Sequence, residues 1–146
     1  MIKIPAKVLI VDDEKDFVEM FSLRLEKQGE KVSTAHSGRE ALEVLEHEPI
    51  DVVILDIRMP GMDGIDTLRQ IKKRYPIVEV ILLTGHGSTE TAVEGMKLGA
   101  FDYLMKPADF EEIKIKLENA RKRKDEQEER IRQAEVRLLI RRSGDI

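Results

Sequence analysis

Short apolar runs alternate with longer amphipathic segments along most of the chain. The run Val52-Val53-Ile54-Leu55 is uniformly apolar and leads directly into Asp56. A run this short and this uniform is typical of a strand buried on both faces of a parallel sheet. Four similar runs predict further strands, and they cover residues 7–11, 31–35, 77–83 and 100–105.

Helix signals occupy the intervals between these runs. Ser37 and Glu40 form a Ser-x-x-Glu capping box at the start of one helix, and Gly29 is placed as the C-terminal stop of the helix before it. The apolar face expected for that earlier helix is formed by Phe17, Met20, Phe21, Leu23 and Leu25. The regular alternation of strand and helix predicts an α/β fold, a doubly wound domain with a five-stranded parallel sheet.

Composition excludes several classes of protein. The 146 residues suffice for one ordinary domain with a core, and no apolar run approaches the ~20 residues that cross a bilayer. The chain has no cysteine, which rules out a disulfide framework, a thiolate metal site and a cysteine nucleophile. These features fit a cytoplasmic protein without a membrane partner. The net charge of −4 argues against general nucleic-acid binding.

Polar side chains follow most of the predicted strands. Right-handed crossovers place the carboxyl ends of parallel strands on one edge of the sheet, where α/β proteins bind their ligands. The residues expected to meet there are Asp12, Asp13, Asp56, Thr84 and Lys106. Each of them alone also fits a structural role as a turn, cap or solvated residue. Their coincidence at one edge favours a functional site.

The chemistry of these side chains indicates phosphoryl transfer. Three converging carboxylates repel one another and require a cation, and a site made only of oxygen ligands suits Mg2+. A lysine and a hydroxyl beside such a metal can neutralise and hydrogen-bond phosphoryl oxygens. Asp56 is the best candidate for a nucleophile that forms an acyl phosphate, since Asp12 and Asp13 come as a pair suited to the metal. The chain has no Walker-type glycine-rich loop, so the phosphoryl group is not expected to come directly from bound ATP.

Four segments of the chain closely resemble the motifs of receiver domains from two-component response regulators. They follow the family's order and spacing, and they are Val8–Glu14, Ile54–Gly64, Leu83–His86 and Gly99–Pro107. The resemblance implies a flavodoxin-like receiver domain over residues 1–120. It also implies a signalling protein that assists its own phosphorylation and dephosphorylation, rather than an enzyme.

The resemblance implies a role for each residue of the site. Asp56 would accept a phosphoryl group from a phosphohistidine on a sensor histidine kinase or a phosphotransfer protein. Asp13, Asp56 and the backbone carbonyl of Arg58 would bind Mg2+, and Asp12 would act mainly through water. Lys106 would bind the phosphoryl group.

The same resemblance implies a switch. Thr84 would move to hydrogen-bond the phosphoryl group, and Tyr103 would turn inward behind it. The surface formed by the fourth helix, the fifth strand and the last helix would then control a partner or an output domain. Arg58 and His86 flank the site and would tune the lifetime of the acyl phosphate.

Residues 121–146 extend beyond a minimal receiver. Neither proline nor glycine interrupts residues 112–142, so the last helix is expected to continue as a highly charged extension. An alternating spacing of four and three residues, typical of a coiled coil, links Ile113, Leu117, Ala120, Lys124, Gln127, Ile131, Ala134 and Leu138. The extension is consistent with a coiled-coil homodimer, a truncated linker to an output domain, a helix that packs on a partner, or a solvated helix that frays. A homodimer through the fourth-helix, fifth-strand and last-helix surface also stays open.

The sequence disfavours three alternatives to the receiver function and its partners. A Mg2+-dependent phosphohydrolase with an aspartyl-phosphate intermediate would use a second acid two residues after the nucleophile, where this chain has Arg58. A pure interaction module that is never phosphorylated is disfavoured by the complete set of site residues. Direct nucleic-acid binding by the basic segment at residues 121–124 is disfavoured because acidic residues follow at once and no reader module is present.

Overall fold

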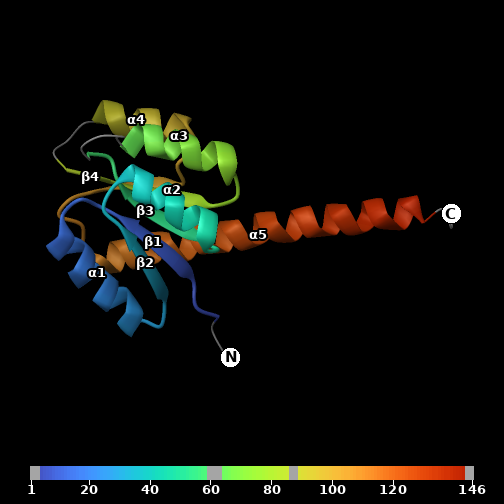
Figure 1. Ribbon diagram of the computed structural model, residues 1–146, viewed down its shortest axis with the longest axis horizontal. Helices are drawn as coiled ribbons and strands as arrows, with labels where there is room; N and C mark the ends of the chain where they lie inside the picture. The colour runs from blue at the N-terminus through green and yellow to red at the C-terminus, as the bar shows by residue number, and fades with distance from the viewer. Residues whose placement is uncertain (1–3, 59–63, 86–88, 144–146) are drawn as a thin grey trace.

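The computed structural model describes residues 4–58, 64–85 and 89–143. Within them strand and helix alternate in the order β1 (Lys7–Val11), α1 (Lys15–Lys27), β2 (Lys31–Ala35), α2 (Gly38–His47), β3 (Val52–Asp56), α3 (Gly64–Arg74), β4 (Glu79–Thr84), α4 (Thr89–Lys97), β5 (Asp102–Met105) and α5 (Phe110–Arg142). The strands form one parallel sheet in the order β2-β1-β3-β4-β5. The predicted doubly wound α/β fold is confirmed (Figure 1).

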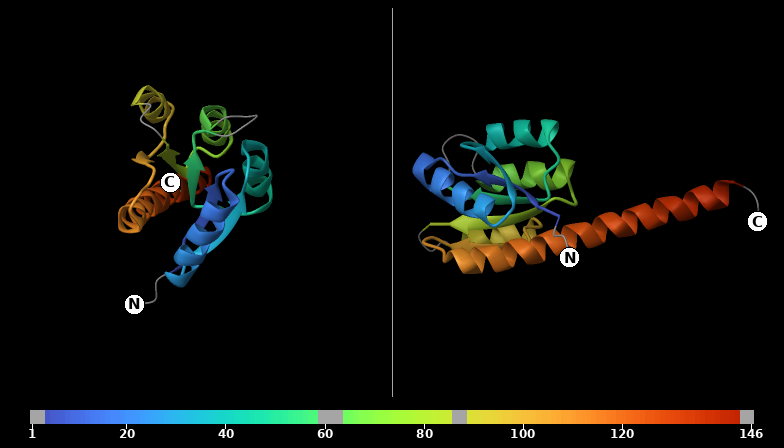
Figure 2. Two further views of the ribbon diagram at one scale, coloured as in Figure 1. Left: turned by 90° about the vertical axis from the view of Figure 1, so that its left-hand side faces the viewer. Right: turned by 90° about the horizontal axis from the view of Figure 1, so that it is seen from below.

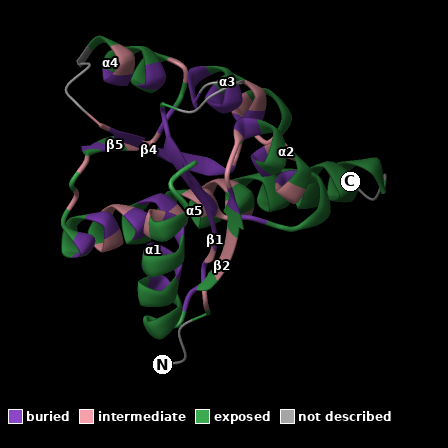
Figure 3. Ribbon diagram, turned by 60° about the vertical axis from the view of Figure 1, so that its left-hand side comes forward, coloured by how far each residue is buried: buried purple, intermediate pink, exposed green. Residues whose placement is uncertain are grey.

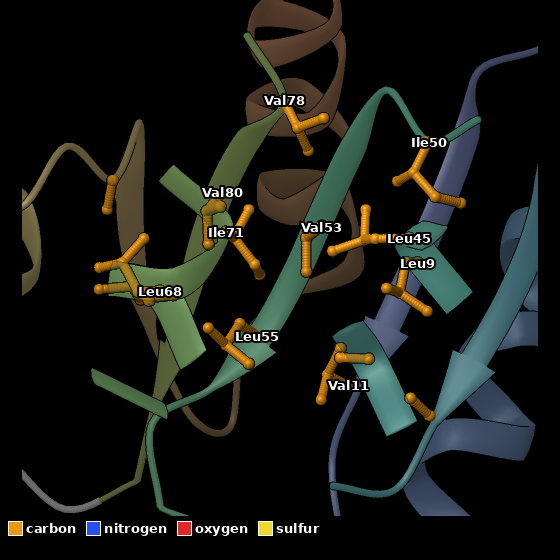
Figure 4. Close-up of a cluster of buried hydrophobic side chains, with 14 of the residues drawn as sticks. Leu9, Val11, Leu45, Ile50, Val53, Leu55, Leu68, Ile71, Val78 and Val80 are labelled. Atoms are coloured by element: carbon orange, nitrogen blue, oxygen red, sulfur yellow. The ribbon is translucent and has the colours of Figure 1, made fainter. Parts of the chain in front are cut away.

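Helices cover both faces of the sheet. α1 and α5 lie on one face, and α2, α3 and α4 lie on the other (Figure 2). Successive residues of a strand point to opposite faces, so the central strand β3 serves both layers. Leu55 packs with Leu68 of α3 in one layer (Figure 4), whereas Ile54 packs with Phe21 of α1 and Ile113 of α5 in the other. This burial on both sides explains why β3 is apolar at consecutive positions.

Two strand boundaries differ from the sequence prediction. β4 begins at Glu79 rather than at residue 77, because the backbone N–H of Val78 donates to the carbonyl oxygen of Tyr75 at 3.0 Å and keeps this segment in a turn. β5 begins at Asp102 rather than at residue 100, since Gly99 adopts a φ of +106° and redirects the chain. The predicted helix start at residue 88 lies outside the described residues.

The first helix buries a narrower face than the sequence predicts. Val18, Phe21 and Leu25 are spaced by three and four residues and pack in the core. Met20 and Leu23 are instead 56% and 55% exposed, so their assignment to the apolar face is wrong. They lie on the outer side of α1.

Both predicted helix signals are confirmed. Gly29 has a φ of +93°, a conformation that costs glycine little and suits the residue after a helix end. The Ser37 hydroxyl accepts a hydrogen bond from the backbone N–H of Glu40 at 3.2 Å, and the Glu40 carboxylate accepts one from the N–H of His36 at 2.8 Å. The start of α2 is therefore capped from both directions.

The last helix runs without interruption for 33 residues and projects from the domain (Figure 1). Its first turns bury Ile113, Leu117 and Ala120 against the sheet. From residue 131 onward every described residue is exposed (Figure 3). The first part of the predicted heptad seam therefore belongs to the core of the domain and is not free to pair with another chain. Among the described helices, α5 included, none has an apolar stretch that could cross a bilayer.

Candidate functional site

Strand register brings the predicted site residues to one edge of the sheet. Val11 pairs with Leu55, so Asp12 follows β1 at the level where Asp56 ends β3. Asp56 pairs in turn with Leu83, which places Thr84 at the end of the neighbouring strand. Lys106 follows β5, and its backbone N–H donates to the carbonyl oxygen of Thr84 at 2.7 Å. The predicted convergence of four strand ends is therefore present.

Three carboxylates form the floor of this edge. Asp12, Asp13 and Asp56 each offer one oxygen, and these oxygens lie within 4.8 Å of one another. Asp12 and Asp56 are buried, whereas Asp13 is exposed. Backbone groups orient the two buried side chains: Asp12 Oδ1 accepts from the N–H of Glu14 at 2.9 Å, and Asp56 Oδ1 accepts from the N–H of Arg58 at 3.1 Å.

Lys106 supplies the positive charge beside these carboxylates. Its Nζ atom lies 2.5 Å from Asp12 Oδ2, 3.7 Å from Asp56 Oδ2 and 3.9 Å from Glu14 Oε1. The ring of Phe17 lies on the same ammonium group, with 4.6 Å from Nζ to the ring centroid. In this arrangement Lys106 is hydrogen-bonded to Asp12 and lies farther from Asp56 Oδ2.

The electrostatics of the pair Asp12 and Asp56 show that one lysine does not balance the site. Burial and the negative charge of Asp12 raise the pKa of Asp56 to about 6, although Lys106 and the N–H of Arg58 act in the opposite direction. Burial alone would lower the pKa of Lys106, but its hydrogen bond to Asp12 and the charge of Asp56 raise it. A further cation at the carboxylates would relieve the remaining repulsion.

The remaining predicted site residues lie around this centre. Thr84 is buried, and its hydroxyl donates to the carbonyl oxygen of Leu104 at a long distance of 3.4 Å. Tyr103 is 42% exposed, so its side chain lies on the outer surface of β5. The Arg58 side chain is exposed. His86, predicted to flank the site, lies outside the described residues.

A pocket of about 660 Å³ opens above the carboxylates. Its lining includes Asp13, Asp56 and Lys106, together with Phe17 and Met20 of α1. The sequence predicts both side chains on the apolar face of α1; Phe17 does pack against the core, whereas Met20 is exposed. The signal that could have placed them here is their proximity in sequence to Asp12 and Asp13, since a helix that follows a strand end begins at the site. A larger groove of about 780 Å³ lies between α5 and the opposite end of the sheet and contains none of the predicted site residues.

The sequence model for the response regulator receiver domain matches residues 8–118. The chain belongs to this family. The match runs from β1 to the first turns of α5, and the described fold is the receiver fold with a last helix that continues to Arg142.

Relatives and solved structures agree with this membership. The receiver is 43% identical over 113 residues to the transcriptional regulatory protein ZraR of Escherichia coli K12, and 44% identical over 115 residues to a putative response regulator NtrX-like protein of Rickettsia bellii. These matches cover 77% of this chain but only 26% and 24% of the relatives, so the chain spans about a quarter of their length.

Two solved structures show the same similarity. A response regulator receiver domain protein from Clostridium thermocellum is 44% identical with a TM-score of 0.78, over 82% of this chain and 97% of that one. NtrX from Brucella abortus, solved in complex with ADP, is 32% identical with a TM-score of 0.82, over 86% of this chain and 29% of that one.

The acidic pocket of this receiver fits a magnesium ion. Receiver domains bind Mg2+ at such a pocket, and the three aspartates here bring their oxygens within 4.8 Å of one another. Mg2+ is commonly held by one or two carboxylates, water and phosphate oxygens. The exposed side chain of Asp13 and the pocket above it leave room for the water and phosphate ligands.

Proposed function

We propose that this receiver domain accepts a phosphoryl group on Asp56 from a sensor histidine kinase or a phosphotransfer protein. The observation that supports the proposal is the position of one buried carboxylate oxygen, Asp56 Oδ2. The other oxygen, Oδ1, is held by the N–H of Arg58, whereas Oδ2 lies 3.7 Å from the Lys106 ammonium. Oδ2 is therefore the oxygen that would attack phosphorus.

The reaction needs little covalent chemistry from the protein. As Asp56 Oδ2 bonds to phosphorus, the bond from phosphorus to the nitrogen of the donor phosphohistidine breaks, and the donor leaves as histidine. Asp12, Asp13, Asp56 and the backbone carbonyl of Arg58 would hold Mg2+, which supplies positive charge for the phosphoryl oxygens when it is bound. Lys106 would then exchange part of its interaction with Asp12 for an interaction with a phosphoryl oxygen.

The proposed switch starts at Thr84. Its hydroxyl has only a 3.4 Å contact with the carbonyl oxygen of Leu104, so an acyl phosphate on Asp56 offers it a stronger, charged acceptor. We propose that Thr84 turns to this acceptor and that Tyr103, now on the outside, turns inward behind it. The surface of α4, β5 and α5 would change accordingly, and it carries the exposed apolar residues Val93, Met96, Tyr103, Met105 and Ile115.

The extension is proposed to form a homodimer through the part of α5 beyond the domain. Ile131 and Leu138 are 45% and 51% exposed and are separated by two helical turns. They continue the face on which Ile113 and Ala120 cover the sheet. The other proposal for the extension is that it links the receiver to an output domain. The surface of α4, β5 and α5 is an alternative interface for a homodimer.

Partners and location follow from the receiver assignment as proposals. Receiver domains of response regulators interact with histidine kinases. The relatives named above are longer and include transcriptional regulatory proteins. Control of transcription by a longer protein that carries this receiver agrees with those names, while these 146 residues themselves are predicted not to bind nucleic acid directly. Cytoplasmic location stays a prediction.

Intact-mass measurement with Mg2+ and acetyl phosphate tests the proposed function. Wild type and an Asp66→Asn control, which removes an exposed carboxylate on α3, should gain one phosphoryl group, whereas Asp56→Asn should gain none. Wild type without added phosphoryl mass would refute the receiver function. Sustained turnover of a phosphomonoester would instead favour the phosphohydrolase, which the exposed Arg58 two residues after Asp56 does not support.

A further inference from the structure

Phe17 contacts the one lysine of the phosphoacceptor site. We propose that Phe17 is a positioning residue for Lys106: its ring holds the ammonium group at the site and lets it turn when it exchanges its hydrogen bond with Asp12 for one with a phosphoryl oxygen. The inference rests on the proposed function, because it concerns the same transfer to Asp56. It adds a residue of α1 that the sequence predicts only as part of the apolar face of the helix.

The geometry is that of a cation–π contact. Lys106 Nζ lies 4.6 Å from the centroid of the Phe17 ring, within the ~6 Å over which a ring face attracts an ammonium group. The lysine side chain is only 18% exposed, so water screens this attraction weakly. The ammonium group of Lys106 is therefore surrounded by carboxylates on one side and by the ring face of Phe17 on another.

The two kinds of contact respond differently when a phosphoryl group arrives. A carboxylate binds the ammonium through a hydrogen bond of defined direction, as Asp12 does at 2.5 Å. That bond must loosen before Lys106 can turn toward a phosphoryl oxygen on Asp56. A ring face attracts the ammonium group without a hydrogen bond of fixed direction and tolerates its rotation. Phe17 can thus retain the cation while its hydrogen bonds are exchanged.

Neighbouring aromatic rings fix the position of Phe17. Its ring stacks on Phe21 with 5.5 Å between centroids and an interplanar angle of 20°. Phe21 contacts Phe110, the first residue of α5, at 5.6 Å, and the Arg24 guanidinium lies 4.1 Å from the centroid of Phe110. Phe21 and Phe110 are both buried. The Phe17 ring is therefore held by the core on one side and presented to Lys106 from α1.

A purely structural role for Phe17 makes a different prediction. If the ring only filled space, any side chain of similar volume would serve, and Lys106 would be unaffected by loss of aromatic character. The partial exposure of Phe17 and its place in the lining of the pocket favour contact with the site over core filling. Phe17→Leu preserves an apolar side chain and removes the ring, whereas Phe17→Tyr preserves the ring.

The rate of phosphorylation by acetyl phosphate with Mg2+ separates the two roles. Phe17→Leu is expected to be phosphorylated about threefold to tenfold more slowly than wild type, and Phe17→Tyr within roughly twofold of wild type. Val18→Ala removes a buried core side chain next to Phe17 without touching Lys106, so it serves as a control for general destabilisation and should keep the wild-type rate. Equal rates for Phe17→Leu and wild type, or equal losses in Phe17→Leu and Phe17→Tyr, would overturn the inference.

An NMR measurement without phosphodonor tests the contact itself. The ring of Phe17 should shift the resonance of the Lys106 ε-methylene group upfield, and Lys106→Met assigns that resonance by its loss. The upfield shift should disappear in Phe17→Leu and persist in Phe17→Tyr, and an unchanged resonance in Phe17→Leu counts against the contact. Wild type that gains no phosphoryl mass would refute the proposed function, whereas normal phosphorylation of wild type with the contrary Phe17 results would refute this inference alone.

Discussion

The Lys124 ammonium lies 2.8 Å from Asp51 Oδ1, at the end of β3 opposite Asp56, the proposed phosphoacceptor. Both side chains are only 14% exposed. The second oxygen of Asp51 accepts from the backbone N–H of Lys7 at 2.9 Å. One carboxylate therefore joins the starts of β1 and β3 to α5 at the point where this helix leaves the domain.

Removal of this carboxylate should destabilise the domain. Asp51→Ala leaves the N–H of Lys7 without its acceptor and the Lys124 cation without its best-buried partner, so we expect the free energy of unfolding to fall by about 1 to 3 kcal/mol. Urea denaturation measures the loss. The matched control is Glu128→Ala, which removes the other carboxylate partner of Lys124 but is 57% exposed, and it should cost less than about 0.5 kcal/mol. Similar losses in the two variants would contradict the special role of Asp51.

The contact between Asp51 and Lys124 predicts that the free energy of unfolding depends on pH. Burial alone would raise the pKa of Asp51, but the hydrogen bonds from Lys124 and from the N–H of Lys7 lower it below its ordinary value of 3.8. A lowered pKa in the folded state means that the stabilisation is complete above the ordinary value and is lost as pH falls through the lowered one. For Lys124 the pKa is raised, because its bonds to Asp51 and Glu128 outweigh burial, so its contribution persists up to the ordinary value of 10.5.

The stability difference between wild type and Asp51→Ala should therefore stay constant from about pH 5 to 10 and shrink in acid below about pH 4. Denaturation curves collected across this range provide the test. A difference that grows in acid would show that the charge on Asp51 is not what stabilises the contact.

In the absence of metal, the charge state of Asp56 should change stability with pH in the opposite direction to that of Asp51. Its pKa is raised from 3.8 to about 6, so the charged form is disfavoured in the folded state. The folded state is thus favoured by this group at low pH, and the benefit is lost as pH rises through about 6. Asp56→Asn is expected to raise the metal-free free energy of unfolding at pH 7 by about 1 to 3 kcal/mol and to make little difference below about pH 4.

Thermal unfolding with and without Mg2+ checks this prediction. Added Mg2+ should stabilise wild type, because the ion binds the folded state, and should stabilise Asp56→Asn less, because one ligand has lost its charge. Asp66→Asn is the control, since its carboxylate is exposed on α3 and lies away from the site. If metal-free Asp56→Asn instead unfolds at a lower temperature than wild type at pH 7, Lys106 compensates the charge of Asp56 well in the wild type.

The site centre could be predicted from the sequence, whereas contacts between helices and strand ends could not. Asp12, Asp56 and Lys106 follow apolar runs, and the geometry of a parallel sheet alone brings such residues together. The contact of Phe17 with Lys106 depends on how far α1 is rotated about its axis. Helical periodicity gives an apolar face but not its orientation, so it wrongly places Met20 and Leu23 on the buried side of α1.

Packing could not be predicted from the sequence pattern of α5 either. A heptad seam of one chain looks identical whether it packs on a partner helix or on the chain's own sheet. Uninterrupted helix to Arg142 could be predicted, since neither proline nor glycine intervenes. The burial of Ile113, Leu117 and Ala120 in the domain could not, because it depends on the packing angle of α5 over β3 and β4.

Gly64 lies too close to the end of β3 to carry a side chain. A Cβ atom at this position would lie 2.6 Å from the carbonyl oxygen of Asp56 and nearer still to the Cα atom of Ile57. Both neighbours are backbone atoms, so the contact cannot be relieved by a rotamer change. The N–H of Gly64 also donates to the carbonyl oxygen of Ile57 at 2.9 Å.

Gly64→Ala should therefore lower the free energy of unfolding by about 1 to 3 kcal/mol and slow phosphorylation of Asp56, because the end of β3 must shift. Urea denaturation and intact-mass kinetics measure the two effects. Gly29→Asn, at a position with a φ of +93° and open space around it, is the control for a glycine needed only for its backbone conformation. It should affect stability mildly and phosphorylation hardly at all, and equal effects at the two positions would contradict the steric argument.

The exposed part of α5 should hold two chains together if it forms the proposed coiled coil. Ile131 and Leu138 lie on one side of the helix, and Val136 lies about 140° away from Ile131 around the axis. A double variant Ile131→Asp, Leu138→Asp places charges in the proposed seam and should convert a dimer into a monomer. Val136→Asp adds a charge to the same exposed turns outside the seam and should leave the dimer intact.

Sedimentation equilibrium with and without acetyl phosphate gives the mass of each species. Dimers of wild type and Val136→Asp, with a monomeric double variant, would support the seam. If all three are monomeric in both conditions, the extension does not dimerise the receiver. If the double variant forms a dimer, and does so only with phosphodonor, the interface lies on the α4, β5 and α5 surface. That surface is the one proposed to respond to phosphorylation.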